Sequence, residues 1–142
     1  MNTHNNYYDL TVDCIGYINE VKVVKPKKGD AFTAIKATLI EGKDGENKIS
    51  IDLILRGSQA AEVLKSQRSK WPQNYVHNGH TWFAGLRIGS LGVKPFTKRD
   101  GSLGAVLSGR LLAIKWLKID KESIQVPPWR HDEQAAAERK VA

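Results

Sequence analysis

The chain has 142 residues, of which 41% are hydrophobic, and a formal net charge of +7. This length is that of one ordinary domain and can bury a real core, whereas two domains would each be only marginally stable. The charge favours an anionic partner and disfavours a basic one, but it carries no information about the fold.

The amino-terminal residues 1–8 are expected to be a flexible segment ahead of a single domain over residues 9–120. They lack the basic and apolar regions of a signal peptide, and no apolar run approaches the roughly 20 residues of a membrane span. We therefore expect a cytoplasmic protein that does not enter a membrane. The only cysteine, Cys14, excludes an intramolecular disulfide and is expected to be a small buried thiol.

Hydrophobic alternation and turn residues predict five strands within this domain. The first contains Gly16, where a strand often coils or bulges, and the fifth is continuously apolar over residues 111–114, which indicates a bulge or burial on both faces. The strands are expected over residues 10–24, 32–41, 49–55, 81–91 and 105–119, with a basic hairpin loop over residues 94–101.

A short helix is expected between the third and fourth strands. Ser58 is placed to cap it, and the helix must end before Trp71 because the following Pro72 disfavours a helical residue ahead of it. On the fourth strand, Trp82 and Phe83 must point to opposite faces, so one of them needs a partner outside the core. Tyr17 and Trp116, which lie beside continuous apolar sequence, are expected to be structural.

The segment over residues 121–142 is expected to be a tail. It contains a Pro-Pro-Trp sequence ending at Trp129 and a short helical pattern over residues 132–140 with few core residues. A tail with no contacts is the plainer interpretation, although a tryptophan in such a segment could anchor a partner protein.

Positive charge is concentrated in two segments, residues 21–36 and residues 87–119. Together they hold twelve Lys or Arg against two acids, Asp30 and Asp100. The second segment includes Lys-Pro-Phe-Thr-Lys-Arg-Asp-Gly over residues 94–101, an aromatic flanked by cations. Cations gather phosphates while an exposed ring stacks on a base, so a single-stranded nucleic acid is the expected partner.

The order of elements, five strands with one helix after the third, is that of an OB-fold, a small and mainly β barrel. Residues 51–57, Ile-Asp-Leu-Ile-Leu-Arg-Gly, followed by Ala60 and Glu62, resemble the third-strand-to-helix junction of bacterial single-stranded-DNA-binding proteins. Gly89 and the sequence over residues 94–101 resemble the fourth strand and basic hairpin of that family. The resemblance implies a base-stacking aromatic in this hairpin.

A second resemblance covers most of the chain. Residues 16–19, Gly-Tyr-Ile-Asn, residues 26–29, Pro-Lys-Lys-Gly, and residues 108–116, Ser-Gly-Arg-Leu-Leu-Ala-Ile-Lys-Trp, resemble replication proteins encoded on bacterial integrative conjugative elements. The resemblance implies a bacterial OB-like protein that handles DNA during replication or transfer of a mobile element.

The chain departs from the single-strand-binding family at two places. Arg56 stands at the end of the third strand, where that family commonly has a tryptophan, and each lost stacking ring could forfeit about 1 to 3 kcal/mol. An arginine can still stack on a base and neutralise a phosphate. The sequence ends Glu-Arg-Lys-Val-Ala and not in the acidic tip through which that family recruits other replication proteins, so recruitment of that kind is not expected.

Candidate binding residues combine rings and cations. Alternation predicts that Phe32 and Lys36 lie on the outer face of the second strand, opposite Ile35. Phe96 could instead fold back onto the barrel, and the turn lysines could be solvated charges that only steer. The expected nucleic-acid-binding residues are Phe96, Lys94, Lys98, Arg99, Phe32, Lys36, Arg56, Arg87, Arg110, Lys27 and Lys28.

Enzymatic chemistry is not expected. His77 and His80 have a spacing that can place two imidazoles on a metal, but no cysteine is near and a surface loop is the simpler interpretation. No phosphate-binding glycine loop, nucleophile motif or paired carboxylates occur, so no metal and no cofactor is expected.

The sequence thus predicts an OB-fold protein that binds single-stranded DNA largely without sequence preference, with DNA favoured over RNA. The alternative is an OB-like module that recruits a replication or conjugation partner, through Trp129 and the tail. Both a monomer and a homo-oligomer are compatible with the sequence.

Overall fold

The computed structural model describes residues 10–72 and 80–129. The expectations for residues 1–8, for His77 and for residues 132–140 concern parts of the chain outside these ranges. The elements of the described part, in chain order, are β1 (Thr11–Val24), β2 (Phe32–Glu41), the 3-10 turn η1 (Lys43–Gly45), β3 (Asn47–Leu55), α1 (Ser58–Ser66), the 3-10 turn η2 (Arg68–Lys70), β4 (Trp82–Thr97), β5 (Leu103–Ile119) and β6 (Glu122–Ile124).

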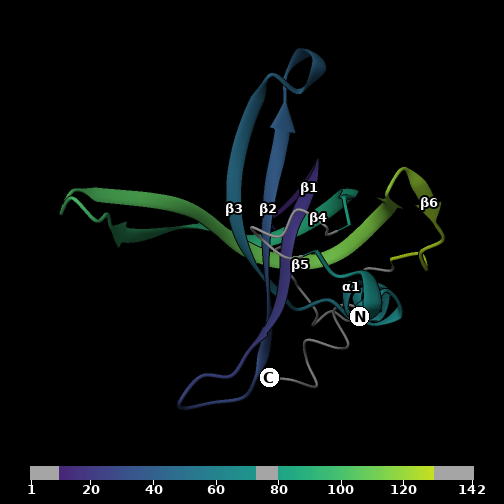
Figure 1. The fold of residues 1–142 in the computed structure, drawn as a ribbon, viewed down its shortest axis with the longest axis horizontal. Coiled ribbons are helices and arrows are strands. Elements are labelled where there is room, and N and C mark those ends of the chain that lie inside the picture. Colours follow the sequence, from purple (N-terminus) through teal and green to yellow (C-terminus); the bar gives the residue numbers. More distant parts are fainter. Residues whose placement is uncertain (1–9, 73–79, 130–142) are drawn as a thin grey trace, which may run out of the picture.

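The first five strands close into a barrel (Figure 1). Strand β1 pairs antiparallel with both β2 and β4, β2 pairs with β3, and β4 pairs with β5. The parallel pairing of β3 with β5 completes the circuit. These pairings, with α1 between β3 and β4, are those of an OB-fold and confirm the predicted fold class.

Three hairpins project from the barrel in different directions (Figure 1). The β2–β3 hairpin carries η1, and the β1–β2 connection leaves the barrel on the other side. The longest is the β4–β5 hairpin, because β4 continues through Phe96 to Thr97. Residues 94–97, predicted to lie in a loop, are therefore strand, and only residues 98–102 turn.

The irregularity of β1 lies after Gly16. The pairing with β2 slips between Ile18 and Glu20, not at the glycine. Gly16 is required for a different reason, since a Cβ there would lie 2.4 Å from the carbonyl oxygen of Thr38 on β2. The slip changes which residues of β1 face outward, so that Lys22, two residues beyond Glu20, joins the outer face.

Trp82 fills the core, and Phe83 faces outward. The Trp82 side chain is fully buried, and its indole nitrogen donates to the carbonyl oxygen of Lys70 at 2.8 Å. Phe83 instead packs between Tyr17 and Trp116 on the outside of the barrel. The prediction of opposite faces is confirmed, and the ring outside the core finds aromatic partners from its own chain.

Hydrogen bonds from the side chain of Gln59 connect the helix α1 to β5. The side chain of Gln59 is buried, accepts from the Ile114 amide at 2.8 Å and donates to the carbonyl oxygens of Ile114 and Pro127 at 2.8 and 2.7 Å. The prediction that Ser58 caps the helix is wrong, because Gly57 occupies the cap position without a side-chain bond.

The middle of β5 is buried on both faces, as its apolar run predicts. Residues 111–114 are all buried, and the pairing with β4 slips between the positions opposite Trp116 and Ile114. Cys14, on β1, is half-buried, and burial raises the pKa of its thiol to about 11. A thiol with this pKa is an unreactive packing group near neutral pH.

The segment after β5 lies on the barrel as far as it is described. β6, which the sequence did not reveal, pairs with the end of β5. Pro127 is bonded to Gln59, and the ring of Trp129 lies 4.4 Å from the guanidinium carbon of Arg87. Residues 122–129 therefore contact the domain instead of extending from it.

Candidate nucleic-acid interface

A groove of about 610 Å³ crosses the outer face of the barrel. It takes residues from all five barrel strands and lies between the base of the β1–β2 connection and the base of the β4–β5 hairpin. Its lining residues are Lys22, Val24, Phe32, Ala34, Ile35, Lys36, Asp52, Leu53, Ile54, Ser90, Lys94, Ser108, Gly109 and Arg110.

Strand alternation places the β2 residues of the groove. Ile35 and Ala37 are buried in the core, while Phe32, Ala34 and Lys36 lie on the opposite face. The outward direction predicted for Phe32 and Lys36 is therefore confirmed. Phe32 is half-buried at one end of the groove, next to its strand partner Val24.

Four cations from four strands line the groove. Lys22 comes from β1, Lys36 from β2, Lys94 from β4 and Arg110 from β5, and all four are exposed. The backbone register places Arg110 beside Ile54 of β3 and beside Gly89 of β4. The groove thus presents four positive side chains around an apolar floor, an arrangement suited to a flexible polyanion.

One acid of the described residues, Asp52, lines the groove together with these cations, and a second, Glu20, lies 3.6 Å from Lys22 at its edge. Asp52 is the strand partner of Lys36, and the Nζ atom of Lys94 lies 3.8 Å from its Oδ2 atom. About a third of the Asp52 side chain is exposed. The pair fixes Lys94 at the groove while lowering the local positive charge by one unit.

The β4–β5 hairpin carries Phe96 beyond the groove. Phe96 lies two residues from Lys94 on the same strand and so on the same face, with 47% of it exposed. Its ring lies across the hairpin over Gly104, where a Cβ would come within 2.8 Å of two ring atoms. The aliphatic stem of Lys98 covers the same glycine. The ring rests on its own hairpin and remains open to solvent.

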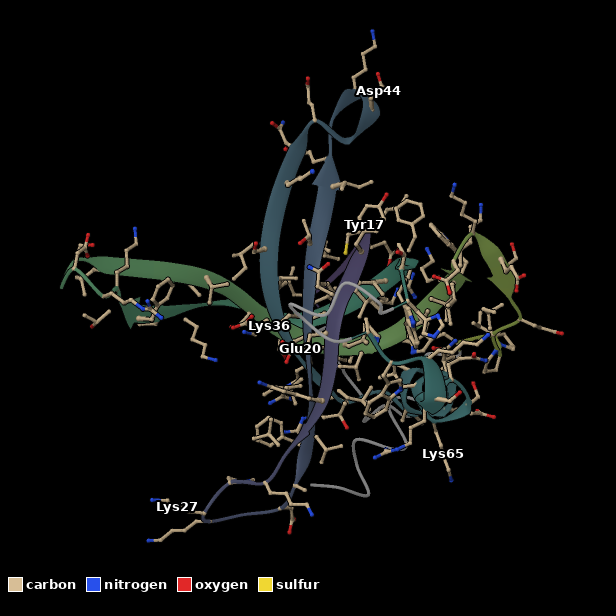
Figure 2. All side chains as sticks on the ribbon, in the orientation of Figure 1. Tyr17, Glu20, Lys27, Lys36, Asp44 and Lys65 are labelled. Carbon is tan, nitrogen blue, oxygen red and sulfur yellow. The ribbon has the colours of Figure 1, made fainter. Side chains whose placement is uncertain are left out.

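The remaining predicted residues lie around or away from the groove. Lys98 and Arg99 lie at the tip of the β4–β5 hairpin and are exposed. Lys27 and Lys28 lie in the β1–β2 connection, where Lys27 projects away from the barrel (Figure 2). Arg56 follows β3 and is exposed, but it does not line the groove.

Arg87 lies on a different part of the surface. Its Nε and Nη2 atoms donate to Oδ1 and Oδ2 of Asp13 at 2.7 and 2.8 Å, and its guanidinium stacks on Trp129. The ion pair lowers the pKa of Asp13 to about 2, chiefly through the hydrogen bonds from Arg87. The structure does not bring Arg87 together with the groove residues.

Lys22 and Asp52 are groove residues that sequence reasoning did not select. Lys22 lies in the first basic segment, but the slip after Ile18 breaks the alternation by which its face would be judged. Only the structure shows that Lys22 pairs with Ala34, between Phe32 and Lys36. Asp52 lies within a strand, and no sequence pattern indicates that it faces Lys94.

Within residues 10–72 and 80–129, no three potential ligands come together to hold a metal ion. His80 is hydrogen-bonded through Nδ1 to Asp120 at 2.5 Å. In the same part of the chain, no helix is long and apolar enough to cross a membrane.

A search of curated proteins found no match. Among solved structures, the chain is similar to the mitochondrial single-stranded DNA binding protein Rim1 of S. cerevisiae, at 14% identity and a TM-score of 0.41. This similarity covers 82% of the present chain and 99% of the other. The family described as "Protein of unknown function (DUF3577)" matches residues 1–133, nearly the whole chain, and the chain belongs to this family.

Proposed function

We propose that this protein is a non-enzymatic OB-fold protein that binds single-stranded DNA, largely without sequence preference. The observation that carries the proposal is the groove with Lys22, Lys36, Lys94 and Arg110 around an apolar floor. In OB-folds generally, the face of strands 2 and 3 and the loops joining strands 1–2 and 4–5 bind oligonucleotides or oligosaccharides. The groove occupies this same face, and its charge favours the nucleic acid.

Phosphates are held by the groove cations and stay close to water. Lysine and arginine neutralise phosphates without reading the bases, which gives affinity without sequence information. Lys27, Lys28, Lys98 and Arg99 extend the positive surface along the two hairpins that border the groove. In this arrangement the hairpins attract the DNA strand electrostatically and the groove binds it.

Bases stack on rings at the two ends of this path. Phe32 lies in the groove, and Phe96 lies about 7 Å beyond Lys94 at a strand rise of about 3.3 Å per residue. Arg56 supplies a planar guanidinium that could stack where a tryptophan is absent. Base stacking is tolerant of sequence because every base has a π face.

The biological setting is proposed from the sequence resemblance alone. A chain similar to replication proteins of bacterial integrative conjugative elements would keep DNA single-stranded during replication or transfer of such an element. The same surface could accept RNA, since stacking and phosphate contacts do not distinguish the two. We propose DNA as the ligand and include RNA in the test.

The test is fluorescence anisotropy with labelled single-stranded DNA, its RNA equivalent and duplex DNA of equal length, across a salt series. We expect the single-stranded DNA to bind more tightly than the duplex. A double variant, Lys36→Gln together with Arg110→Gln, removes two phosphate contacts. It should lower the slope of log affinity against log salt by about 1.4.

A matched control is Lys43→Gln with Lys48→Gln. These lysines lie on the β2–β3 hairpin, which leaves the barrel in a different direction from the β1–β2 connection and the β4–β5 hairpin (Figure 1), and neither lines the groove. The double replacement changes the net charge by the same amount as the groove variant. Equal affinity for single-stranded and duplex DNA would contradict the proposal. So would equal losses in the groove and control variants, because the binding would then follow net charge only.

A further inference from the structure

An aromatic row with a second hollow lies elsewhere on the barrel. Phe83 of β4 lies between Tyr17 of β1 and Trp116 of β5, with ring centroids 4.8 Å and 5.2 Å apart respectively. Tyr17, expected from the sequence to be structural, is 40% exposed, and Ile15, two residues earlier on the same face, is also exposed. A hollow of about 300 Å³ opens beside the rings, lined by Tyr17, Thr81, Phe83, Lys118 and Lys121.

The charge at the rim of this hollow is positive. Lys118 is the strand partner of Phe83, and Lys121 lies in the tight β5–β6 turn with a φ of 72°. The nearby acid, Asp120, accepts hydrogen bonds from His80 and from the Thr81 amide, which lower the pKa of its carboxyl. Both oxygens of this carboxylate are therefore already engaged. Lys118 and Lys121 form no ion pair within residues 10–72 and 80–129, and both are exposed.

We propose that the hollow at Tyr17 and Phe83 is a second contact site for the same single-stranded nucleic acid. A base stacks on the exposed ring of Tyr17, and the neighbouring phosphates lie against Lys118 and Lys121. This inference rests on the proposed function, because it assigns a second contact site to the same DNA strand that the groove binds. A base–aromatic contact flanked by cations is the common unit of sequence-tolerant single-strand binding.

Strand β1 connects the two sites. In Figure 2, β1 runs from Tyr17 past Glu20 towards the β1–β2 connection that carries Lys27, and Lys22 of the groove follows Glu20 on the same strand. Lys22 is the fifth residue after Tyr17, and five steps span about 16 Å at a strand rise of about 3.3 Å. That distance equals about five nucleotides at the 3.4 Å spacing of a duplex strand, and fewer in an extended strand.

The surface between the sites does not block this path. The carboxylate of Glu20 lies 3.6 Å from the Nζ atom of Lys22 and is the strand partner of Lys36, so cations flank it. Asn19 is held by a hydrogen bond from its Nδ2 atom to the Thr38 hydroxyl at 2.7 Å. A nucleic-acid strand that leaves the groove at Lys22 therefore passes Glu20, whose charge is paired, and Asn19, a small polar side chain, before it reaches the rings.

The test compares a short oligonucleotide of about 4 thymidines, too short to fill the groove and also reach Tyr17, with a long one of about 20, since one OB-fold covers about 4 to 16 nucleotides. Tyr17→Leu keeps the side chain apolar but removes the ring. We expect it to lower the affinity for the long oligonucleotide about five-fold or more and to leave the short one, held by the groove, unchanged. Tyr17→Phe should restore binding of the long oligonucleotide.

Lys118→Gln with Lys121→Gln should weaken binding of the long oligonucleotide and lower its salt slope. The groove variants Lys36→Gln and Arg110→Gln should weaken binding of both lengths. An oligonucleotide carrying 5-bromouracil, irradiated in the complex, should crosslink to Tyr17 only when it is long enough to reach from the groove.

Failure of this inference differs from failure of the proposed function. If the groove variants lose affinity while Tyr17→Leu and the lysine pair bind the long oligonucleotide normally, the second site is wrong and the groove proposal stands. If the groove variants have no effect, the groove proposal fails whatever happens at Tyr17. Sedimentation that shows a dimer of the free protein, converted to monomer by Tyr17→Leu, would assign the rings to an interface between copies and overturn the inference.

Discussion

Arg87 on β4 and Asp13 on β1 form a two-point ion pair, with Nε–Oδ1 and Nη2–Oδ2 distances of 2.7 and 2.8 Å. The guanidinium also lies over the ring of Trp129, and Lys115 approaches the same carboxylate at 3.4 Å. One side chain thus joins β1, β4 and the segment after β6. The charge of Arg87 is therefore already paired within the protein.

We therefore expect Arg87→Gln to change stability more than binding. Loss of the ion pair and of the stacking on Trp129 should lower the free energy of unfolding by about 1 to 2 kcal/mol, measured by urea denaturation. The affinity for single-stranded DNA should stay within about two-fold of the unchanged protein, because Arg87 lies away from the groove. Arg110→Gln should instead lower the affinity and leave the free energy of unfolding nearly unchanged. A large loss of binding in Arg87→Gln would place Arg87 on the DNA path.

The ion pair also predicts a pH dependence. Since the pKa of Asp13 is lowered from 3.8 to about 2, its stabilising effect is present above about pH 4 and is lost as the pH falls towards 2. Asp13 is 44% exposed, so the effect is below about 1 kcal/mol. Asp13→Asn should melt below the unchanged protein at pH 7, and the difference should vanish near pH 2. A difference that persists at pH 2 would show that the asparagine acts through packing.

Asp52→Asn should strengthen binding of single-stranded DNA. The carboxylate repels phosphates in the groove and holds Lys94 at 3.8 Å, and the amide does neither. One charge–charge interaction near water is about 1 kcal/mol, so we expect about a five-fold gain at low salt that fades as salt rises. Glu46→Gln, at the distant η1 hairpin, is the matched control. Weaker binding in Asp52→Asn would mean that the carboxylate itself accepts a hydrogen bond from a base.

Gly104→Ala offers a way to move the ring of Phe96 without deleting it. The added Cβ would come within 2.8 Å of two ring atoms, and the ring can give way because it is half exposed. We expect unchanged thermal stability and a loss of single-strand affinity similar to that of Phe96→Leu. Gly92→Ala on the same hairpin meets only Ser108 at 3.5 Å and should bind normally. Normal binding by both variants would remove Phe96 from the proposed path.

The sequence predicted the barrel because its signals are local. Alternation assigned Phe32 and Lys36 to the outer face of β2, and the turns between strands limited the possible pairings. Lys22 could not be assigned, because a one-residue slip after Ile18 reverses the face of every residue that follows and has no sequence signature. The extension of β4 through Pro95 was also hidden. A strand of a two-stranded hairpin has a free edge, where proline is tolerated.

The contacts of Arg87 could not be predicted for a different reason. Its partner Asp13 is 74 residues away, and only the pairing of β1 with β4 brings them together. A list of cations does not show which of them are neutralised by the fold. The pairing of Asp52 with Lys94 was hidden in the same way.

The β4–β5 hairpin becomes a two-stranded ribbon where it leaves the barrel. The pairing of β1 with β4 ends at Gly89, and that of β3 with β5 ends at Leu107, so Val93 to Thr97 are supported by β5 alone. An isolated two-stranded ribbon is marginally stable in water. Amide hydrogens of this part of β4 should therefore exchange much faster than those of its barrel half, although both belong to one strand. A ligand that holds Phe96 would slow that exchange at an entropic cost, so the affinity of the protein would be adjustable through the stiffness of the ribbon.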